Sequence, residues 1–373
     1  MKKVLLVATV QSHICQFHRP LVEILHKHNC IVHVAARDNL KEKNGLKLDF
    51  ADKVFDIPFC RSPFELKNVT AYKKLKKVID EGGYDVIHCN TPVGGVLTRL
   101  AAKKVRKNGT KVYYTAHGFH FYKGAPLINW LLYYPVEKIL ARKTDKLITI
   151  VEEDYQLAKS KFKCPVYRIH GVGVDEKRFY PLNYEEKINL RKKLGFTENQ
   201  KIILCVGELL ANKNQQMIIK CMPQILEKIP EAILLIAGNG PKRDELEALI
   251  GSLDLQKKVI MLGYATNIQE YHQISDILVS CSIREGLGLN VIESMMTGNP
   301  VVLTDNRGHR ELVDDGRCGY LVEINDTSRM SENIKNLFHL KDKYKIFSQN
   351  ARLFSYVYCS GEVVKEIEYL YEI

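Results

Sequence analysis

Short apolar runs alternate with longer amphipathic segments along almost the whole chain, and this alternation constrains the fold more than any other feature. Runs that are apolar throughout are typical of parallel strands buried on both faces. The first half contains seven strand candidates rich in apolar residues: Val4–Thr9, Ile31–Ala35, Val54–Ile57, Val86–Cys89, Lys111–Thr115, Leu147–Ile150 and Val166–Ile169. The second half contains five: Ile202–Val206, Ile233–Ala237, Val259–Leu262, Ile277–Ser280 and Val301–Thr304. The pattern predicts an α/β fold with two successive doubly wound, Rossmann-like sheets.

A polar, charge-rich interval between about residues 172 and 200 separates the two sets of runs. We therefore expect an N-terminal domain over residues 1–172 and a C-terminal domain over residues 173–355. The amphipathic segment 356–373 follows the second sheet, and we expect it to return to the first domain as a helix. Ligands of open α/β sheets bind at the carboxyl ends of the strands, so we expect two sheets facing each other across a cleft.

Charge is divided unevenly between the two halves. The 373 residues include 55 Lys and Arg against 43 Asp and Glu, a net charge of +12, and the apolar share of 46% excludes a disordered chain. Residues 1–180 hold 32 of the basic and 17 of the acidic side chains, whereas residues 181–373 hold 23 and 26. The first half is therefore strongly cationic, which favours an anionic partner for that half.

The ten cysteines are scattered singly, without a CxxC pair, so we expect neither a disulfide framework nor a cysteine zinc site. This usage favours the reducing cytoplasm. The N-terminal MKKVLLVATVQSH indicates a first strand and lacks the cleavage site of a signal peptide. No run reaches the ~18 apolar residues of a membrane-spanning helix, so any membrane contact is expected to be peripheral.

The most informative segment, residues 282–302, connects two of the predicted strands through a glycine-rich turn and a helix. Glycines let the backbone approach a ligand closely, and the free N–H groups at a helix start favour a phosphate. Glu285 and Glu293 flank this anion site, too far apart to share a proton. Because an ionised carboxylate only accepts hydrogen bonds, each suits hydroxyl groups of an extended ligand, such as a sugar or a ribose.

This segment resembles the E-x7-E motif of the retaining GT-B glycosyltransferases of family 4. The resemblance rests on two glutamates eight positions apart, the glycines between them and the continuation Thr297-Gly-Asn-Pro-Val-Val. It implies that Glu285 binds hydroxyls of a donor sugar and that Glu293 binds the ribose. The backbone of Gly286, Leu287, Gly288 and Leu289 is then expected to lie against the sugar and the diphosphate.

The loop after the first strand of the second domain, which starts at Gly207, carries a lysine that suits a diphosphate leaving group. Lys213 matches the lysine of the family's G-R-L-x-x-x-K pattern. The arginine of that pattern is absent, because Glu208 occupies its position. One of the two positive charges expected beside the diphosphate is therefore missing. Its alternatives are Arg284 and a basic residue of the first domain, and the sequence leaves this choice open.

Two further turns of the second domain resemble the family's nucleotide-binding segments. Gly238, Asn239 and Gly240 precede a proline, as in the family's G-x-G-P turn, and Gly263 with Tyr264 resembles the segment beside the nucleobase. Both can equally be ordinary turns.

One histidine of the first domain matches the family's H-G motif, whose histidine reaches the donor sugar. His117 precedes Gly118 at the end of a predicted strand, and the resemblance assigns it, with Glu285 and Lys213, to catalysis. We expect structural roles for His13, His18 and His120. The family's glycine-rich loop after the first strand is replaced here by residues 9–15, Thr-Val-Gln-Ser-His-Ile-Cys.

No D-x-D occurs in the chain, so the usual metal ligands of GT-A glycosyltransferases are lacking and we expect neither a metal nor another cofactor. The leaving diphosphate is then stabilised by Lys213, backbone amides and a helix N-terminus. For retention, the family resemblance implies attack on the same face of the sugar that the phosphate leaves.

Basic clusters and aromatic residues occur together in the first half. Lysines line an apolar stripe over residues 72–79, residues 103–111 add a second basic cluster, and residues 124–134 hold the only tryptophan. This combination fits an anionic membrane surface. A solvated helix face beside a buried aromatic helix is the alternative. Nucleic acid is disfavoured, since no zinc finger, RNP-type motif or basic arm is present.

The segments 117–124 and 306–311 resemble family members that build bacterial capsule or exopolysaccharide units. We therefore expect a hexosyltransferase that moves a sugar, such as an N-acetylhexosamine, from a UDP-sugar to a polyprenyl-diphosphate-linked saccharide at the inner face of the cell membrane. Two alternatives remain. One is an isomerase like the UDP-N-acetylglucosamine 2-epimerases, which share the fold, and the other is a basic module that binds nucleotides or nucleic acid without catalysis.

Overall fold

The chain folds into two compact units. The computed structural model describes residues 1–42 and 46–373, and its units are Met1–Gly173 with Ser360–Ile373, and Val174–Cys359. The division lies one residue from the expected position. The segment that returns to the first unit begins at Ser360 and not at 356, since residues 356–359 stay with the second unit. There Tyr358 accepts a hydrogen bond from Val174 N through its carbonyl oxygen, over 2.9 Å.

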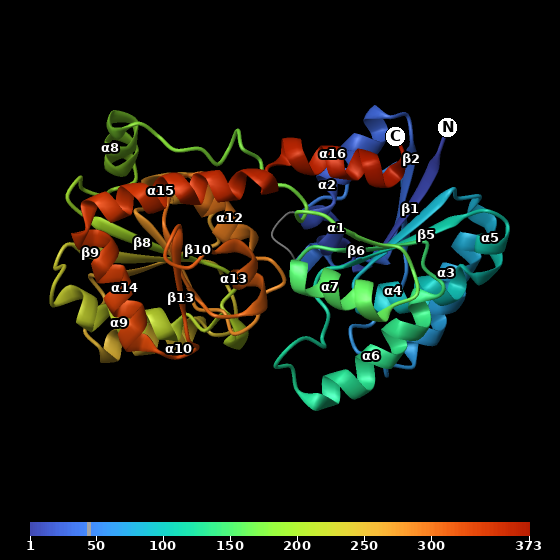
Figure 1. Ribbon diagram of the computed structural model, residues 1–373, viewed down its shortest axis with the longest axis horizontal. Coiled ribbons are helices and arrows are strands. Elements are labelled where there is room, and N and C mark those ends of the chain that lie inside the picture. The colour runs from blue at the N-terminus through green and yellow to red at the C-terminus, as the bar shows by residue number, and fades with distance from the viewer. Residues whose placement is uncertain (43–45) are drawn as a thin grey trace. The chain divides into compact units, whose positions relative to one another are not determined.

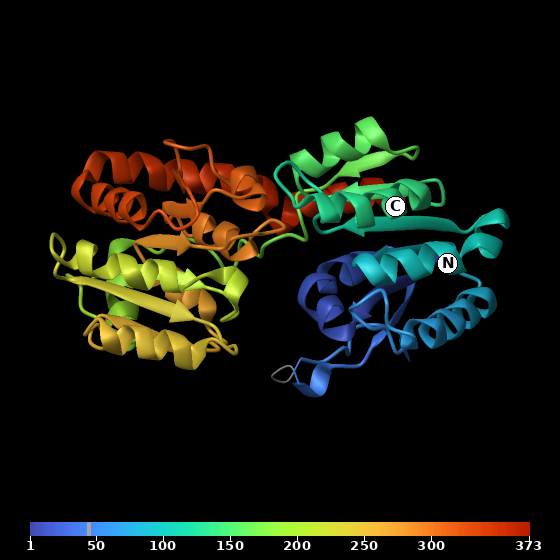
Figure 2. The same cartoon turned by 90° about the horizontal axis from the view of Figure 1, so that it is seen from below.

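The first unit is built on a seven-stranded parallel sheet with helices on both faces (Figures 1 and 2). The strand order is β3-β2-β1-β4-β5-β6-β7. The strands are β1 (Lys3–Val10), β2 (Ile31–Arg37), β3 (Lys53–Asp56), β4 (Val86–Asn90), β5 (Lys111–Ala116), β6 (Lys146–Thr149) and β7 (Val166–Arg168). All seven predicted strands are present. β1 and β4 are almost fully buried, as expected for central parallel strands.

The helices of the first unit are mostly crossovers between these strands. They are α1 (Gln11–Phe17), α2 (Arg19–Lys27), the 3₁₀ helix η1 (Leu40–Glu42), α3 (Lys67–Gly82), α4 (Pro92–Ala101), α5 (Lys103–Lys107), α6 (Leu127–Ala141) and α7 (Glu152–Lys161). The C-terminal helix α16 (Ser360–Tyr371) completes the unit.

Helix α16 is held to the first unit by a buried polar contact. His88 of β4 lies with Nδ1 2.6 Å from the hydroxyl of Tyr371 and with Nε2 2.7 Å from the hydroxyl of Thr115. Burial lowers the pKa of His88 to about 3, so this imidazole is neutral at pH 7. The end of the chain is thereby fixed against the centre of the first sheet.

The second unit is built on a six-stranded parallel sheet of order β10-β9-β8-β11-β12-β13. Its strands are β8 (Lys201–Val206), β9 (Ala232–Ala237), β10 (Val259–Gly263), β11 (Ile277–Ser280), β12 (Val301–Thr304) and β13 (Gly319–Val322). The sequence predicts the first five and misses β13, a four-residue edge strand that starts on a glycine. Gly319 is needed there, since a Cβ at this position would lie 2.4 Å from the carbonyl oxygen of Val301.

The helices of the second unit cover both faces of its sheet (Figure 2). They are α8 (Tyr184–Lys193), the 3₁₀ helix η2 (Ala211–Lys213), α9 (Gln216–Leu226), α10 (Arg243–Ser252), α11 (Ile268–Ile274), α12 (Leu289–Met296), α13 (Arg307–Leu312), α14 (Thr327–His339), α15 (Lys341–Ser355) and the 3₁₀ helix η3 (Tyr356–Tyr358).

The strand order reverses direction between β1 and β4 in the first sheet, and between β8 and β11 in the second. Loops after such neighbouring strands diverge to opposite faces and leave a crevice at the carboxyl edge of the sheet. In the second unit, the loops after β8 and β11 carry Lys213 and Glu285, two of the predicted site residues. The sheet topology therefore brings together segments that are 72 positions apart.

All ten cysteines are free, and seven of them are buried. Burial raises the pKa of the Cys89 and Cys205 thiols to about 12, because a thiolate is poorly solvated in an apolar core. These cysteines behave as small core residues.

Candidate functional site

Lys213 and Glu285, predicted from separate motifs, form an ion pair in the second unit. Their loops are tied by two hydrogen bonds: Ile283 N donates to Asn212 O over 2.8 Å, and the Asn212 side-chain amide donates to Arg284 O over 2.9 Å. The side chains of the pair are 23% and 12% exposed, so a ligand at the carboxyl edge of the sheet can reach both. A lysine beside an acceptor-only carboxylate can bind a phosphate and a hydroxyl group next to each other.

The helix that carries Glu293 begins directly after the glycine-rich turn. Gly288 precedes α12 with φ of 93°, a left-handed conformation that favours glycine. The Asn290 side-chain amide donates to Val206 O over 2.9 Å, which ties the first turn of α12 to the end of β8. The first N–H groups of this helix therefore lie at the crevice, where backbone donors suit a phosphate.

Glu293 has a partner that the sequence did not indicate. One of its carboxylate oxygens lies 3.5 Å from Nε2 of His272, a fully buried residue of α11. Within residues 1–42 and 46–373, neither ring nitrogen of His272 has a hydrogen-bond partner. Only tertiary packing brings these two residues together, since α11 precedes β11 and α12 follows it.

The predicted glycine turns converge on the loop after β8. A Cβ at Gly238 would lie 1.9 Å from Gly207 O, so only glycine allows this approach. Gly238 N donates to Gly263 O over 2.7 Å, and Leu209 N donates to Asn239 O over 3.0 Å. Tyr264, on the same turn as Gly263, is 55% exposed and free to contact a ligand. These three turns therefore form one continuous rim at this edge of the sheet.

The structure adds Arg243 to the candidates for the positive charge that the family's arginine would supply. Glu208, which replaces the family's arginine, is exposed, and Arg284 is also exposed. Arg243, at the start of α10, was not predicted. Its Nη1 lies 3.8 Å from where a Cβ at Gly263 would stand, so its guanidinium is beside the rim. The sequence offered no motif for Arg243, because its nearness to Gly263 depends on the pairing of β9 with β10.

Helix α13, which the sequence did not link to the site, packs against the loop that carries Glu285. A Cβ at Gly308 of α13 would lie 2.9 Å from Cβ of Glu285, so this glycine lets α13 pack closely under the loop. His309 is buried next to it, with Nδ1 2.7 Å from Thr304 O and 2.9 Å from the amide nitrogen of Asn306. Burial lowers the pKa of His309 to about 4. The segment 306–311, singled out in the sequence, is therefore a support for the Glu285 loop.

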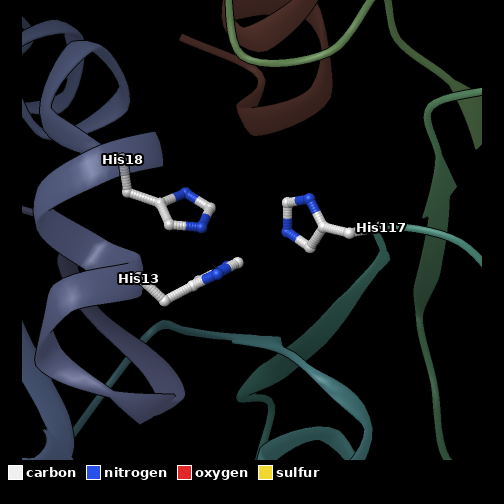
Figure 3. Close-up of side chains that lie close together, drawn as sticks. All are labelled: His13, His18 and His117. Atoms are coloured by element: carbon white, nitrogen blue, oxygen red, sulfur yellow. The ribbon is translucent and has the colours of Figure 1, made fainter. Parts of the chain in front are cut away.

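His117 lies in the first unit, on the loop that follows β5. Its Nε2 is 3.1 Å from the side-chain oxygen of the buried Asn90. The rings of His13 and His18 stand beside it, with centroids 4.9 and 5.7 Å away (Figure 3). Burial lowers the pKa of His117 to about 4 and lowers the pKa of the other two well below the ordinary value. The sequence indicated separate structural roles for His13 and His18 and gave no sign of this cluster.

The aromatic segment of the first unit presents an apolar face to solvent. In α6, Trp130 and Tyr134 pack against the core of the unit. The opposite side carries six exposed large apolar residues at helical spacing: Leu127, Ile128, Leu131, Leu132, Val136 and Ile139. The expected alternative, a buried aromatic helix, therefore describes only one side of α6. In the part of the chain that the structure describes, no helix has the length and apolarity to cross a bilayer.

Two family models match the chain. Residues 3–151 match the model described as Glycosyl transferase 4-like, and residues 186–354 match the model described as Glycosyl transferases group 1. A relative from Bacillus subtilis, the putative glycosyltransferase EpsD, is 44% identical over 99% of this chain and 96% of its own length. A second relative, from Escherichia coli, is 29% identical over 75% of this chain and 73% of its own. It is a UDP-Gal:alpha-D-GlcNAc-diphosphoundecaprenol alpha-1,3-galactosyltransferase.

Solved structures show the same architecture. Anabaena HepE in complex with UDP and glucose matches with a TM-score of 0.79 and 19% identity, and the match covers all of both chains. A sucrose-phosphate synthase from Thermosynechococcus elongatus matches with a TM-score of 0.80 and 19% identity, over 100% of this chain and 98% of the other. The fold class predicted from the sequence, GT-B, is confirmed. The family predicted from Glu285, Glu293 and the glycines between them is confirmed as well, and the chain belongs to the group 1, family 4-like glycosyltransferases.

Proposed function

We propose that this glycosyltransferase takes its sugar from a UDP-sugar bound at the carboxyl edge of the second sheet. The observation that carries the proposal is the meeting of Lys213 and Glu285 beside the start of α12. A UDP-sugar presents hydroxyls, a diphosphate and a ribose in line, and these side chains and amides offer acceptors and donors in a matching order. The complexes of HepE with UDP and with UDP-glucose support the choice of nucleotide.

Each residue then has a distinct part in the reaction. Glu285 accepts hydrogen bonds from the donor sugar, and Glu293 accepts them from the ribose. Lys213 moves from its ion pair with Glu285 to the diphosphate and offsets the charge that develops as the phosphate leaves. Arg243 or Arg284 supplies the second cation in place of the family's arginine. Because these groups neutralise the diphosphate, the transfer requires no metal.

The transfer proceeds with retention of configuration at the anomeric carbon. The bond from that carbon to the phosphate oxygen breaks as the acceptor oxygen approaches on the same face. The leaving phosphate oxygen takes the acceptor's proton, so no side chain has to form a covalent bond to the sugar.

Binding measurements with two variants test the donor site. Calorimetric titration should show binding of UDP and of UDP-sugars such as UDP-N-acetylglucosamine, and weaker binding of GDP and ADP. Glu293→Gln should weaken UDP and UDP-sugars alike, since the ribose is common to both. Glu285→Gln should weaken UDP-sugars more than UDP, since only UDP-sugars carry the hydroxyls that it accepts. Equal losses for both ligands in Glu285→Gln, or no response to any nucleotide, would contradict the proposal.

A product assay separates transfer from isomerisation. In a transferase, the donor sugar is consumed in step with the appearance of UDP and of a lengthened acceptor. An epimerase would change the sugar of the UDP-sugar without any acceptor, and that result would overturn the assignment. NMR of the anomeric proton in the product distinguishes retention from inversion.

We further propose that the acceptor is a polyprenyl-diphosphate-linked saccharide, presented at the inner face of the cell membrane during capsule or exopolysaccharide synthesis. The diphosphoundecaprenol acceptor of the Escherichia coli relative supports this acceptor class. The exposed apolar face of α6 supports the membrane contact, because such a face is suited to the boundary between headgroups and acyl chains. Exposed lysines of α3, including Lys67, Lys73 and Lys74, add about 1 kcal/mol each near an anionic surface.

Liposome sedimentation tests the membrane contact. The protein should bind vesicles of phosphatidylglycerol and phosphatidylcholine more tightly than vesicles of phosphatidylcholine alone. Leu131→Gln should weaken binding to both. The matched control is Leu353→Gln in α15 of the second unit, because Leu353 and Leu131 are both 71% exposed. Equal effects of the two substitutions would exclude α6 as the contact, and equal binding to both vesicles would exclude an electrostatic part.

A further inference from the structure

Three histidines of the first unit are gathered around one point. His13 lies in α1, His18 lies between α1 and α2, and His117 follows β5. One ring nitrogen of each lies within 4.8 Å of one ring nitrogen of each of the others. Figure 3 shows the three rings pointing toward one another across a common space. Within residues 1–42 and 46–373, this is the one group of three or more potential metal ligands that meets this distance.

The fold explains why residues 100 positions apart converge. β4 lies between β1 and β5 in the sheet, and the carboxyl ends of all three lie at the same edge. Helix α1 begins immediately after β1, so His13 stays at that edge. His18 ends α1 and precedes α2, with its backbone N–H donating to Ile14 O over 2.9 Å. The turn between the two short helices places the ring of His18 beside that of His13, at 5.2 Å between centroids.

The polar atoms of this cluster are incompletely satisfied. Nε2 of His13 and Nε2 of His18 are buried, and neither has a hydrogen-bond partner in the described part of the chain. The whole His18 residue is only 4% exposed. A buried polar atom without a partner is unfavourable, so two of them on facing rings destabilise the fold unless a ligand binds there. A cation between the rings would satisfy both nitrogens.

The third ring is already oriented. His117 Nε2 lies 3.1 Å from the side-chain oxygen of Asn90, which is fully buried and so cannot swing away. Histidines that bind metals commonly donate their second N–H to a carbonyl or carboxylate oxygen, which fixes the ring and its tautomer. If Nδ1 is the nitrogen that binds the ion, His117 keeps this contact with Asn90. The cluster thus has both the ligands and a supporting residue.

We propose that His13, His18 and His117 bind one divalent transition-metal ion, with Zn²⁺ as the best match. Imidazole ligands suit Zn²⁺, Cu²⁺ and Ni²⁺, whereas Mg²⁺ and Ca²⁺ prefer oxygen ligands, which this group lacks. Zn–N bonds of about 2.0–2.1 Å require small ring rotations that draw the nitrogens closer than in the structure. Three protein ligands leave a fourth position for water or a hydroxyl group.

This site goes beyond the proposed transfer reaction, whose diphosphate is neutralised by groups of the second unit. The ion has no step in that reaction. Its binding can be measured without a sugar donor or acceptor, so failure of the metal site and failure of the transferase proposal are separate outcomes.

Titration of the untagged, EDTA-treated protein tests the site. Zn²⁺ should bind and raise the melting temperature that Trp130 fluorescence reports, and Mg²⁺ should do neither. His13→Gln and His18→Gln should each lower the Zn²⁺ affinity by more than about 100-fold, since loss of a ligand exceeds the 10–100-fold effect of losing a ligand's hydrogen-bond partner. The matched control is His339→Gln, an exposed histidine of α14, which should bind Zn²⁺ as the wild type does.

Two further measurements separate ligand loss from unfolding and from binding by cysteines. Without metal, circular dichroism should show His13→Gln and His18→Gln to be folded, so that a loss of Zn²⁺ affinity reports the loss of a ligand and not unfolding. The absorption spectrum of the Co²⁺-loaded protein should show tetrahedral nitrogen and oxygen ligands, without the charge-transfer band of thiolates. Unchanged Zn²⁺ affinity in both variants, thiolate ligation, or no Zn²⁺ binding at all would overturn the proposal.

Discussion

At the residue scale, the donor site depends on a few side chains that meet only through their loops. Lys213 and Glu285 share an ion pair, and their loops are joined through Asn212. Below them, Gly308 leaves the space in which α13 packs against Glu285. A glycine to alanine change at 308 therefore moves the carboxylate without touching any ligand. The chemistry of the site is set by side chains, and its geometry is set by the contacts between these loops.

Lys213→Met should lower kcat by about 10²–10³, because one charge that stabilises the leaving phosphate is lost. The melting temperature should change little, since the lysine is partly exposed. UDP release from a UDP-sugar in the presence of acceptor measures the rate. Lys242→Met serves as control, because Lys242 forms an exposed pair with Glu245 in the same unit. A kcat for Lys213→Met within about threefold of the wild type would refute a role in leaving-group departure.

His88 makes the stability of the first unit dependent on pH. Its pKa is about 3 in the folded protein and about 6.5 when unfolded, so below pH 6.5 only the unfolded chain takes up the proton. The stabilising effect is therefore complete above pH 6.5 and is lost as the pH falls, at about 1.4 kcal/mol per pH unit. Burial also lowers the pKa of His13, His18 and His117, so each of them likewise makes the folded state less stable as the pH falls.

Urea unfolding followed by Trp130 fluorescence measures this effect, because the only tryptophan of the chain lies in the first unit. Between pH 7 and pH 5, the free energy of unfolding should fall in the wild type. In His88→Gln the slope of this fall should be smaller than in the wild type. Below pH 6.5 the two slopes should differ by about 1.4 kcal/mol per pH unit, because the variant lacks this proton uptake. Parallel pH profiles for the two proteins would mean that His88 does not titrate on unfolding.

At the element scale, α6 is exposed on one side and strongly fixed on the other. Arg99 of α4 makes two hydrogen bonds to the Glu137 carboxylate, at 2.8 and 3.1 Å, and its side chain is 1% exposed. Although burial opposes the charge, Glu137 keeps the pKa of Arg99 above its ordinary value. Arg99 also stacks on Tyr114, 4.0 Å from the ring centroid. This pair holds the apolar face of α6 in a fixed position on the unit.

Glu137→Ala should lower the free energy of unfolding of the first unit by about 3–5 kcal/mol, because it leaves a buried guanidinium without its partner. Replacing both residues, with Arg99→Met and Glu137→Leu, should restore most of the loss, since no buried charge remains. Urea unfolding monitored by Trp130, seven residues before Glu137, reports the change. If the double variant is no more stable than Glu137→Ala, the pair does more than neutralise a buried charge.

At the scale of the whole molecule, charge and chemistry are separated between the units. The predicted nucleotide-binding residues, from Gly207 to Glu293, belong to the second unit, and the basic clusters and α6 belong to the first. Each unit has its own sheet and core, so each can respond to its own ligand. The C-terminal helix α16 joins the first unit through Tyr371, although it follows the second unit in sequence.

UDP should stabilise the second unit selectively. At a concentration 100-fold above its Kd, a ligand adds about 2.7 kcal/mol to the unit that binds it. Scanning calorimetry should therefore show one transition that moves to higher temperature with UDP. The transition that coincides with the change in Trp130 fluorescence should move much less. A larger shift in the Trp130 transition than in the other would place the nucleotide on the first unit.

Most of the strands and the residues of the donor motif could be predicted from the sequence. Of the thirteen strands in the described part of the chain, twelve were predicted, because the strands of a parallel sheet covered by helices are rich in apolar residues. The edge strand β13 was missed, since it begins at a glycine, a residue that is depleted in strands. Glu285, Glu293 and Lys213 were found because their spacing is fixed by a local turn, helix or loop.

Which distant residues meet could not be predicted, because it depends on the tertiary fold. His272 beside Glu293, Arg243 beside Gly263 and the cluster of His13, His18 and His117 have no local signature. Their proximity follows from strand order and from the packing of helices on the sheets, neither of which leaves a fixed spacing in the sequence. The exposed side of α6 was equally hidden, because an apolar helix looks the same in sequence whether one side or both are covered. Local geometry is encoded by spacing, whereas long-range contact is decided by topology.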